Sequence, residues 1–526
     1  MKNTASDNNP EWIAALMKPD SYDHPVESIQ LIETHISWVV LTGAYAYKIK
    51  RPVDLGFVDF SSLEKRKFYC EEEVRLNRRL ARDIYLAVVA IKGTHEEPRL
   101  SGEGEIIEYA VKMVQFPIEA QLDRFVNRDA LSSKHIDAFA RLIAAFHGQI
   151  DRADNSVAYG DLEHLSQPVL ENFIQIRQQI GDSTSTDSLS KLESYSRSDI
   201  SRLSTVFEQR KNRGFVRECH GDLHLANMAW VESKPLVFDC IEFNPNLRWI
   251  DVMSEIAFLI MDLEKRGQSR LAYRFLNSYL EGTGDYSGLR VLNFYLVYRV
   301  IVRAKVEAIR ANQSDASPEE RVAGKKAFHE YLQLAVQYSQ ERPLKLIITH
   351  GLSGSGKSTL AQGLVERIGA VRIRSDVERK RLFGLDPEEA SQSSPDGNLY
   401  SEAANRQTYQ KLVELSRAAL EGGYSVVVDA ACLAASQREL FKALASKMQV
   451  PYTILEITAS EATLKRRIAS RQDGVSDADL NVLETQIQAV EKLQADEKPH
   501  AILIDTELPV DMESLVKELN SKVQIP

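Results

Sequence analysis

The segment Gly351–Ser358 constrains the fold of this chain more than any other. It reads G-L-S-G-S-G-K-S and follows the largely apolar run Leu344–Thr349. A loop of the form G-x-x-x-x-G-K-[ST] between a strand and a helix is a P-loop, in which backbone N–H groups and the helix N-terminus surround phosphate oxygens. The sequence therefore predicts a nucleotide site at the start of a C-terminal domain.

Predicted strands and helices alternate from Leu344 to the end of the chain, which predicts a doubly wound parallel sheet. We expect Lys357 to reach the β- and γ-phosphates and Ser358 to bind Mg²⁺. The residues expected to hold the nucleotide are Gly351, Ser353, Gly354, Ser355, Gly356, Lys357, Ser358 and Thr359.

Three later features indicate transfer of a phosphoryl group to a substrate. Asp376 follows the second predicted strand and is a candidate general base, and Arg379, one helical turn on, is a candidate anchor for an anionic acceptor. Asp429 ends the strand V-V-V-D and is a candidate Mg²⁺ partner. Arg467 and Arg471, four residues apart, could close over the phosphates as a lid, or could form a solvated basic helix.

A second signature of phosphoryl transfer lies upstream. Cys219–Asn227 reads C-H-G-D-L-H-L-A-N. Phosphoryl transfer needs a carboxylate that accepts the proton of the attacking hydroxyl, and oxygen ligands for Mg²⁺. Asp222 suits the first role, and Asn227 and Asp239 suit the second. His224 is a weaker catalytic candidate, and packing of the loop is the favoured interpretation of this residue.

These residues resemble the aminoglycoside phosphotransferase family over roughly residues 25–340, which implies a two-lobed, protein-kinase-like fold. The resemblance implies that Lys48 contacts the α- and β-phosphates, with Lys50 or Arg51 as alternatives. It also implies a partner glutamate among Glu71–Glu73; Glu73 is preferred, but the sequence does not separate the three. The adenine-binding hinge is expected near 113–116. Gly43 is the only glycine between Trp38 and Lys48, so no G-x-G-x-x-G loop is present.

The C-terminal part resembles the P-loop kinases that include gluconate kinase, zeta toxin and polynucleotide kinase. The spacing Asp376-x-x-Arg379 and the strand that ends at Asp429 are similar to polynucleotide kinase. Residues 430–433 read A-A-C-L, where that enzyme is expected to have Thr and Asn, which disfavours a nucleic-acid acceptor. The whole chain resembles bacterial bifunctional fusions of an aminoglycoside phosphotransferase with an ATP-binding protein.

Charge and cysteine content narrow the partners and the compartment. The 526-residue chain has a net charge of -10, which disfavours broad binding to nucleic acid or anionic membranes because phosphates require surplus Lys and Arg. Its four cysteines form no C-x-x-C pair, so neither a zinc site nor a disulfide framework is expected. The N-terminus lacks the apolar core of a signal peptide, and we expect a cytoplasmic protein.

We therefore expect a multidomain α/β and α+β protein with an N-terminal extension (1–24), a kinase-like N-lobe (25–117), a helical C-lobe (118–341) and a P-loop kinase domain (342–526). Residues 181–190, rich in Ser, Thr and Asp, are expected to form a loop, and a closing helix is expected over 328–340. The expected activity is ATP- and Mg²⁺-dependent phosphorylation of small hydroxylated metabolites at two sites. The alternatives are a kinase regulated by a second ATP-binding domain, and a toxin-like or polynucleotide-kinase-like C-terminal activity.

Overall fold

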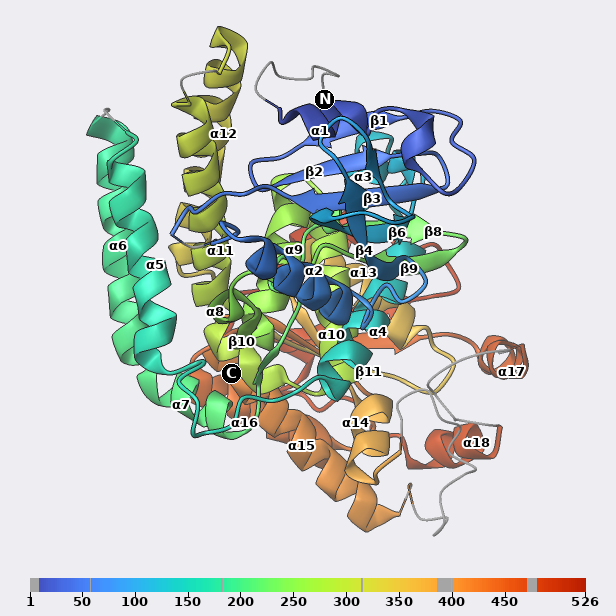
Figure 1. Ribbon diagram of the computed structural model, residues 1–526. Coiled ribbons are helices and arrows are strands. Elements are labelled where there is room, and N and C mark those ends of the chain that lie inside the picture. The colour runs from blue at the N-terminus through green and yellow to red at the C-terminus, as the bar shows by residue number, and fades with distance from the viewer. Residues whose placement is uncertain are drawn as a thin grey trace. The chain divides into compact units, whose positions relative to one another are not determined.

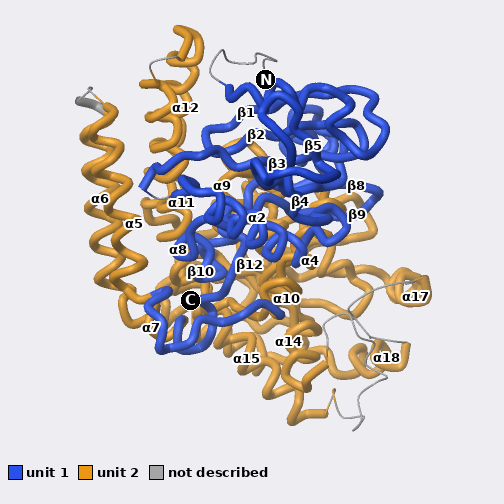
Figure 2. The backbone as a smooth tube through the Cα atoms, in the orientation of Figure 1, with its two compact units in different colours: residues 1–131, 149–160, 211–255 blue, residues 132–148, 161–210, 256–526 orange. Residues whose placement is uncertain are grey.

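The computed structural model describes residues 9–56, 58–180, 183–313, 316–385, 399, 401–470 and 480–526. The chain divides into two compact units (Figure 2). Unit 1 contains residues 1–131, 149–160 and 211–255, and unit 2 contains residues 132–148, 161–210 and 256–526. The chain passes between the units several times, so neither unit is one continuous stretch of sequence.

Unit 1 is built on a six-stranded antiparallel sheet in the order β1-β2-β3-β6-β4-β5. Trp38 and Val40 of β2 and Tyr47 and Ile49 of β3 are buried in one hydrophobic cluster on one face of this sheet, and residues on the other face of β3, such as Ala46 and Lys50, are buried as well. The strands are β1 (Gln30–Glu33), β2 (Ser37–Leu41), β3 (Tyr45–Lys50), β4 (Tyr85–Gly93), β5 (Pro98–Arg99) and β6 (Ile106–Val114).

Helix α2 (Leu63–Asn77) packs against β4 and β6 and begins at Ser62, whose side chain accepts a hydrogen bond from the Lys65 N–H. Two antiparallel pairs of short strands, β7 with β10 and β8 with β9, flank the segment that carries Asp222 and Asp239. The remaining elements of the unit are α1 (Glu11–Ala15), α3 (Leu122–Asn127), β7 (Val216–Glu218), β8 (Met228–Val231), β9 (Lys234–Val237), α8 (Pro245–Arg248) and β10 (Trp249–Asp251).

The first part of unit 2 is helical. Helices α11 and α12 run side by side, as do α5 and α6 (Figure 1). The helices are α4 (Ser133–Gln149), α5 (Leu162–Arg177), α6 (Ser183–Arg202), α7 (Ser204–Asn212), α9 (Val252–Lys265), α10 (Ser269–Thr283), α11 (Leu289–Ala311) and α12 (Pro318–Ser339), of which α4, α7 and α9 each begin in one unit and end in the other.

The second part of unit 2 is a five-stranded parallel sheet in the order β12-β13-β11-β14-β15. Its central strands are fully buried and rich in Val and Ile, as expected for a sheet covered on both faces. The strands and helices are β11 (Leu346–His350), α13 (Lys357–Ile368), β12 (Val371–Arg374), α14 (Ser375–Leu382), α15 (Glu402–Glu421), β13 (Val426–Asp429), α16 (Ala435–Met448), β14 (Tyr452–Thr458), α17 (Glu461–Ala469), α18 (Leu480–Ala489), β15 (Ala501–Asp505) and α19 (Met512–Ser521).

The predicted fold class is confirmed, and two local predictions are wrong. Within the residues that the structure describes, 183–190 are helical and belong to α6, because Leu189 and Leu192, one turn apart, are both buried. Helix α12 begins ten residues earlier than expected, since Ser317 and Glu320 form a capping box and Pro318 stands at the first helical position. None of the described helices is long and apolar enough to cross a membrane.

Candidate functional sites

Strand β3 of unit 1 directs two lysines at one buried carboxylate. Lys48 and Lys50 are two residues apart and therefore point to the same face of the strand. Glu73, fully buried on α2, accepts both: its Oε1 lies 2.8 Å from Lys48 Nζ and its Oε2 lies 2.7 Å from Lys50 Nζ. Of the three adjacent glutamates, the structure therefore pairs Glu73 with Lys48.

Two further carboxylates, from the segment after β9, complete this cluster. Asp239 Oδ1 lies 2.5 Å from Lys48 Nζ. The Glu242 carboxylate forms an ion pair with Lys50, whose side chain is only 1% exposed. Asp239 has a φ of 64°, which is uncommon for a residue with a side chain, and its N–H donates to the Tyr85 hydroxyl at 3.1 Å. Strained backbone of this kind persists where surrounding contacts enforce it, and it presents the Asp239 carboxylate to Lys48.

Each charged group of this cluster stabilises the ionised form of its partner. Burial favours the neutral form of Lys48, but the carboxylates of Asp239 and Glu73 outweigh it and raise the pKa of Lys48 well above its ordinary value. Burial also disfavours the ionised form of Glu73, but Lys48 and Lys50 outweigh it and lower the pKa of Glu73. The lysines therefore stay charged at neutral pH, as contact with the phosphates of a nucleotide requires.

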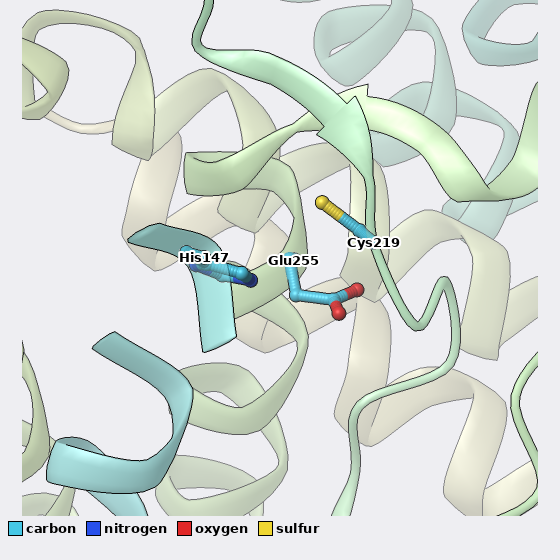
Figure 3. Close-up of side chains that lie close together, drawn as sticks. All are labelled: His147, Cys219 and Glu255. Atoms are coloured by element: carbon cyan, nitrogen blue, oxygen red, sulfur yellow. The ribbon is translucent and has the colours of Figure 1, made fainter. Parts of the chain in front are cut away.

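A buried carboxylate also anchors the loop that carries Asp222. Glu255, in the first turn of α9, accepts hydrogen bonds from the N–H groups of His220 at 2.7 Å and Gly221 at 2.9 Å. Figure 3 shows the Glu255 carboxylate and the Cys219 side chain at this loop. Gly221 has a φ of 89°, and a Cβ there would lie 2.8 Å from the Leu247 carbonyl oxygen, so the turn requires glycine.

The turn brings Asp222 and Asn227 together. Asn227 Nδ2 donates to Asp222 Oδ2 at 3.0 Å and to the Asp222 carbonyl at 3.1 Å. His224 Nε2 lies 3.2 Å from Asp222 Oδ2. The Asp222 side chain remains about one third exposed, at 34%, and can be approached by a substrate. The amide oxygen of Asn227 and the carboxylate of Asp239 are hard oxygen donors, which fit Mg²⁺.

The P-loop of unit 2 connects β11 to α13 and takes a shape that only glycine allows. Gly351 has a φ of 155° and a Cβ there would lie 2.3 Å from the Ile457 carbonyl oxygen; at Gly354, with a φ of 84°, it would lie 3.0 Å from the Leu464 carbonyl oxygen. Lys357 Nζ donates to the Leu352 carbonyl at 2.8 Å. These features fit the cradle that a P-loop forms around phosphate groups.

Asp429 lies directly beside Ser358, the last residue of the P-loop motif. Ser358 Oγ donates to Asp429 Oδ1 at 3.2 Å. Asp429 Oδ2 is buried but accepts no hydrogen bond within the described part of the chain; Arg374 Nε approaches it to 3.7 Å. A buried carboxylate oxygen without a hydrogen bond, next to the hydroxyl of Ser358, fits the Mg²⁺ of a P-loop nucleotide.

A cavity of about 530 Å³ opens over the P-loop. Asp376 lies on its wall in the first turn of α14, and Arg379 lies on the same helix with its Nη1 donating to the Leu399 carbonyl at 2.9 Å. The cavity is large enough for a small ligand beside the phosphates. The residues from the P-loop, α13, the ends of β12 and β13, and α14 that line it are Ser353, Gly354, Gly356, Lys357, Ser358, Thr359, Arg374, Ser375, Asp376, Arg379 and Asp429.

Arg467, one of two arginines on α17, donates hydrogen bonds to the P-loop and to Thr506. Arg467 Nη1 donates to the Gly354 carbonyl at 3.3 Å and to Thr506 Oγ1 at 2.9 Å, and Nη2 donates to the Thr506 carbonyl at 2.8 Å. The predicted partner Arg471 lies outside the described residues. Gln486, from α18, accepts a hydrogen bond from the Ser353 N–H at 2.8 Å and had no sequence signal, because it lies 133 residues from the loop.

Motifs identified none of the supporting residues Lys50, Glu242, Glu255, Arg374 and Glu281. The sequence offers Lys50 only as an alternative to Lys48, whereas the structure pairs both lysines with Glu73. A signal existed in retrospect for Glu242, since it follows Asp239 by one turn of chain and is a charged residue within an otherwise apolar stretch. The four cysteines are buried free thiols.

Comparisons with known proteins agree with the two predicted resemblances. The sequence profile of the phosphotransferase enzyme family matches residues 69–292, and that of an AAA domain matches residues 346–493. Three curated relatives, each called an uncharacterized protein, come from Mycobacterium bovis and two strains of Mycobacterium tuberculosis. Each is 31% identical over 461 residues, which cover 86% of this chain and 89% of the relative.

Solved structures with similar parts include an amicoumacin kinase in complex with AMP-PNP, Ca²⁺ and Ami (13% identity, TM-score 0.39, 62% of this chain and 94% of that chain). A putative aminoglycoside phosphotransferase from Ralstonia eutropha matches at 15% identity with a TM-score of 0.37, over 63% of this chain and 98% of that one. A gluconokinase from Sinorhizobium meliloti matches at 20% identity with a TM-score of 0.25, over 35% of this chain and 93% of that one.

The two matched domains define the chain as a kinase, a phosphotransferase that uses ATP. It belongs to the same family as the mycobacterial proteins, and in this chain the family joins a phosphotransferase-family region to a P-loop domain.

Proposed function

We propose that the chain carries two separate ATP- and Mg²⁺-dependent phosphotransferase sites, each acting on a hydroxyl group of a small molecule of the sugar, aminoglycoside-like or nucleotide-sugar class. The observation that carries this proposal is that each unit contains a full set of groups for phosphoryl transfer within itself. A carboxylate for the acceptor proton, a lysine for the phosphates and oxygen donors for a metal are present in each.

In unit 1, Asp222 would orient the acceptor hydroxyl and take its proton. Lys48, held by Glu73, would contact the α- and β-phosphates, and Asn227 and Asp239 would hold Mg²⁺, which supplies neutralisation of the phosphate charge. The 2.5 Å contact between Lys48 and Asp239 supports this assignment, because both side chains already point at the same space.

In unit 2, Lys357 and the P-loop amides would bind the β- and γ-phosphates, and Ser358 with Asp429 would hold Mg²⁺. Asp376 would serve as the base, and Arg379 would bind an anionic group of the acceptor. Arg467, and with it Arg471, would stabilise the transferring phosphate. The support for this set is that Asp376, Arg379, Lys357 and Ser358 line one cavity.

The test is labelling of a bacterial metabolite extract with γ-³²P-ATP by wild type, Asp222→Asn and Lys357→Ala. We expect each substitution to remove a different labelled small molecule. Asp154→Asn and Lys442→Ala are the matched controls, because Asp154 is exposed and accepts a hydrogen bond from the Ser156 N–H, and Lys442 pairs with Asp496 and does not line the cavity. If one substitution leaves all labelling intact although its unit binds ATP in wild type, that unit regulates the other and the two-kinase proposal is wrong. Growth arrest on expression, lost in Asp376→Ala, would instead indicate a toxin-like activity.

A further inference from the structure

Helix α10 of unit 2 lies within the match to the phosphotransferase family, yet it is bound to the P-loop domain. Asn277, fully buried on α10, accepts a hydrogen bond from the Arg372 N–H at 2.6 Å and donates to the Ala370 carbonyl at 3.0 Å. Helix α10 also packs against α13 and β12. Strand β12 is the edge strand of the parallel sheet, and Asn277 from α10 forms hydrogen bonds with backbone groups at this edge.

Glu281, one turn beyond Asn277 on α10, binds two arginines of β12. Its Oε1 accepts hydrogen bonds from Arg372 Nε at 2.9 Å and Nη2 at 2.6 Å. Its Oε2 accepts one from Arg374 Nη1 at 3.2 Å. The Glu281 side chain is 15% exposed, so solvent screens these ion pairs only in part. Arg372 fixes the carboxylate in place, and the carboxylate then fixes Arg374.

Arg374 lies between Glu281 and the metal-binding side of the P-loop site. It lines the cavity together with Asp376, and its Nε stops 3.7 Å from Asp429 Oδ2. That separation is longer than a hydrogen bond, so the Asp429 oxygen stays available. A guanidinium free to move closer would add a hydrogen bond to this ion pair with Asp429 and would compete with a divalent cation for the carboxylate.

We propose that Glu281 is a positioning residue for the P-loop site: it holds Arg374 beside Asp429 but beyond hydrogen-bond distance, so that helix α10 completes the P-loop site. This inference rests on the proposed function of the P-loop domain. It predicts that the phosphotransferase-family region cannot be separated from the P-loop domain without weakening metal binding there.

The consequence is a specific change in the Mg²⁺ requirement. Replacing Glu281 by Gln removes the charge that restrains Arg374, and Arg374 then pairs with Asp429 and adds an uncompensated positive charge beside the metal. We expect the Mg²⁺ concentration for half-maximal effect to rise about tenfold in Glu281→Gln. In Arg374→Met the competitor is gone, so the requirement stays equal or falls.

The experiment uses the full chain in an Asp222→Asn background, which silences the proposed base of unit 1. Two quantities are measured with Mg²⁺ and ATP alone as probes: release of labelled phosphate from γ-³²P-ATP, and the Mg²⁺-dependent part of ATP binding by calorimetry. The contribution of the P-loop is the difference from the same protein carrying Lys357→Ala. Glu366→Gln is the matched control, because Glu366 also bridges the P-loop domain to α10, through Arg274 at 2.8 Å, and does not line the cavity.

The expected result is a tenfold shift in Glu281→Gln, less than a twofold shift in Glu366→Gln, and no additional shift when Glu281→Gln is added to Arg374→Met. An equal shift in the two glutamate variants, or a shift that persists in the double variant, overturns the inference. A rise in the Mg²⁺ requirement of Arg374→Met alone also overturns it, and this arm stands even if Glu281→Gln does not fold. If Lys357→Ala changes neither measurement, the proposed function of the P-loop domain fails first, and the inference fails with it.

Discussion

Glu73 gives the sharpest test of the unit 1 site, because it is the only carboxylate that both lysines of β3 share in the described cluster. Its side chain is fully buried, and its two oxygens lie 2.8 Å and 2.7 Å from Lys48 and Lys50. The change Glu73→Gln keeps the size of the side chain and removes its charge. Both lysines then stay buried with one fewer negative partner.

The loss in unfolding free energy depends on the carboxylates that still contact the two lysines. Removing one partner of a buried ion pair costs about 3–5 kcal/mol. Lys48 keeps Asp239 and Lys50 keeps Glu242, so we expect the lower end, about 3 kcal/mol, in the free energy of unfolding of unit 1. At an m-value of about 3 kcal/mol per molar urea, the midpoint would fall by about 1 M. Displacement of Lys48 would also reduce phosphotransfer by the unit 1 site, on the order of 10²-fold.

Tryptophan fluorescence during urea unfolding reports this change selectively. The chain has four tryptophans, Trp12, Trp38, Trp230 and Trp249, and all four belong to unit 1. Trp38 is 2% exposed, so its emission will change on unfolding. Following one unit by its own probe avoids treating the whole chain as a single two-state transition.

Glu71→Gln is the matched control, on the same helix and with the same chemical change. Glu71 is 55% exposed and lies 3.7 Å from Lys67, an exposed pair that contributes less than about 0.5 kcal/mol. We expect its midpoint within about 0.2 M of wild type. Equal midpoints for Glu73→Gln and Glu71→Gln would refute the argument that the buried lysines depend on Glu73.

Three other predictions use different measurements. The pKa of Glu73 lies below its ordinary value of 4.5, so the contribution of its charge to stability is complete above about pH 5 and is lost as pH falls below 4.5. The difference in unfolding free energy between wild type and Glu73→Gln should therefore shrink over that acidic range. A difference that stays constant with pH would contradict this prediction. Gly351→Ala would place a Cβ 2.3 Å from the Ile457 carbonyl, so calorimetry should show P-loop ATP binding weakened by at least about tenfold, whereas Gly363→Ala, whose Cβ would meet only side-chain atoms at 3.3 Å or more, should keep it. Removal of Mg²⁺ by EDTA should abolish labelling from γ-³²P-ATP at both sites, and adding back Mg²⁺ without Ca²⁺ should restore it. Labelling that survives in EDTA would show that the oxygen donors hold no required metal.

Local patterns predicted the elements that carry the chemistry. The apolar run Leu344–Thr349 contains most of β11, and the run V-V-V-D is strand β13, because an uninterrupted apolar run is a local property of the sequence. Residues 183–190 were mistaken for a loop, because Ser and Thr favour turns in isolation whereas the buried Leu189 and Leu192 favour a helix in the folded unit. Long-range burial decided between the two, and a short window of sequence does not contain it.

Two of the residues that motifs missed, Glu242 and Glu281, share a physical property: each is a counter-charge supplied from far along the chain. Glu242 reaches Lys50 across 192 residues, and Glu281 reaches Arg374 across 93. A reacting group must have a fixed chemistry and a fixed spacing within its loop, so a motif records it. A counter-charge needs only to arrive within about 3 Å with the right sign, and many positions in a fold can supply it. The reacting groups are therefore legible in the sequence, while the charges that tune them, and through Glu281 the dependence of the P-loop site on helix α10, become visible only once the chain is folded.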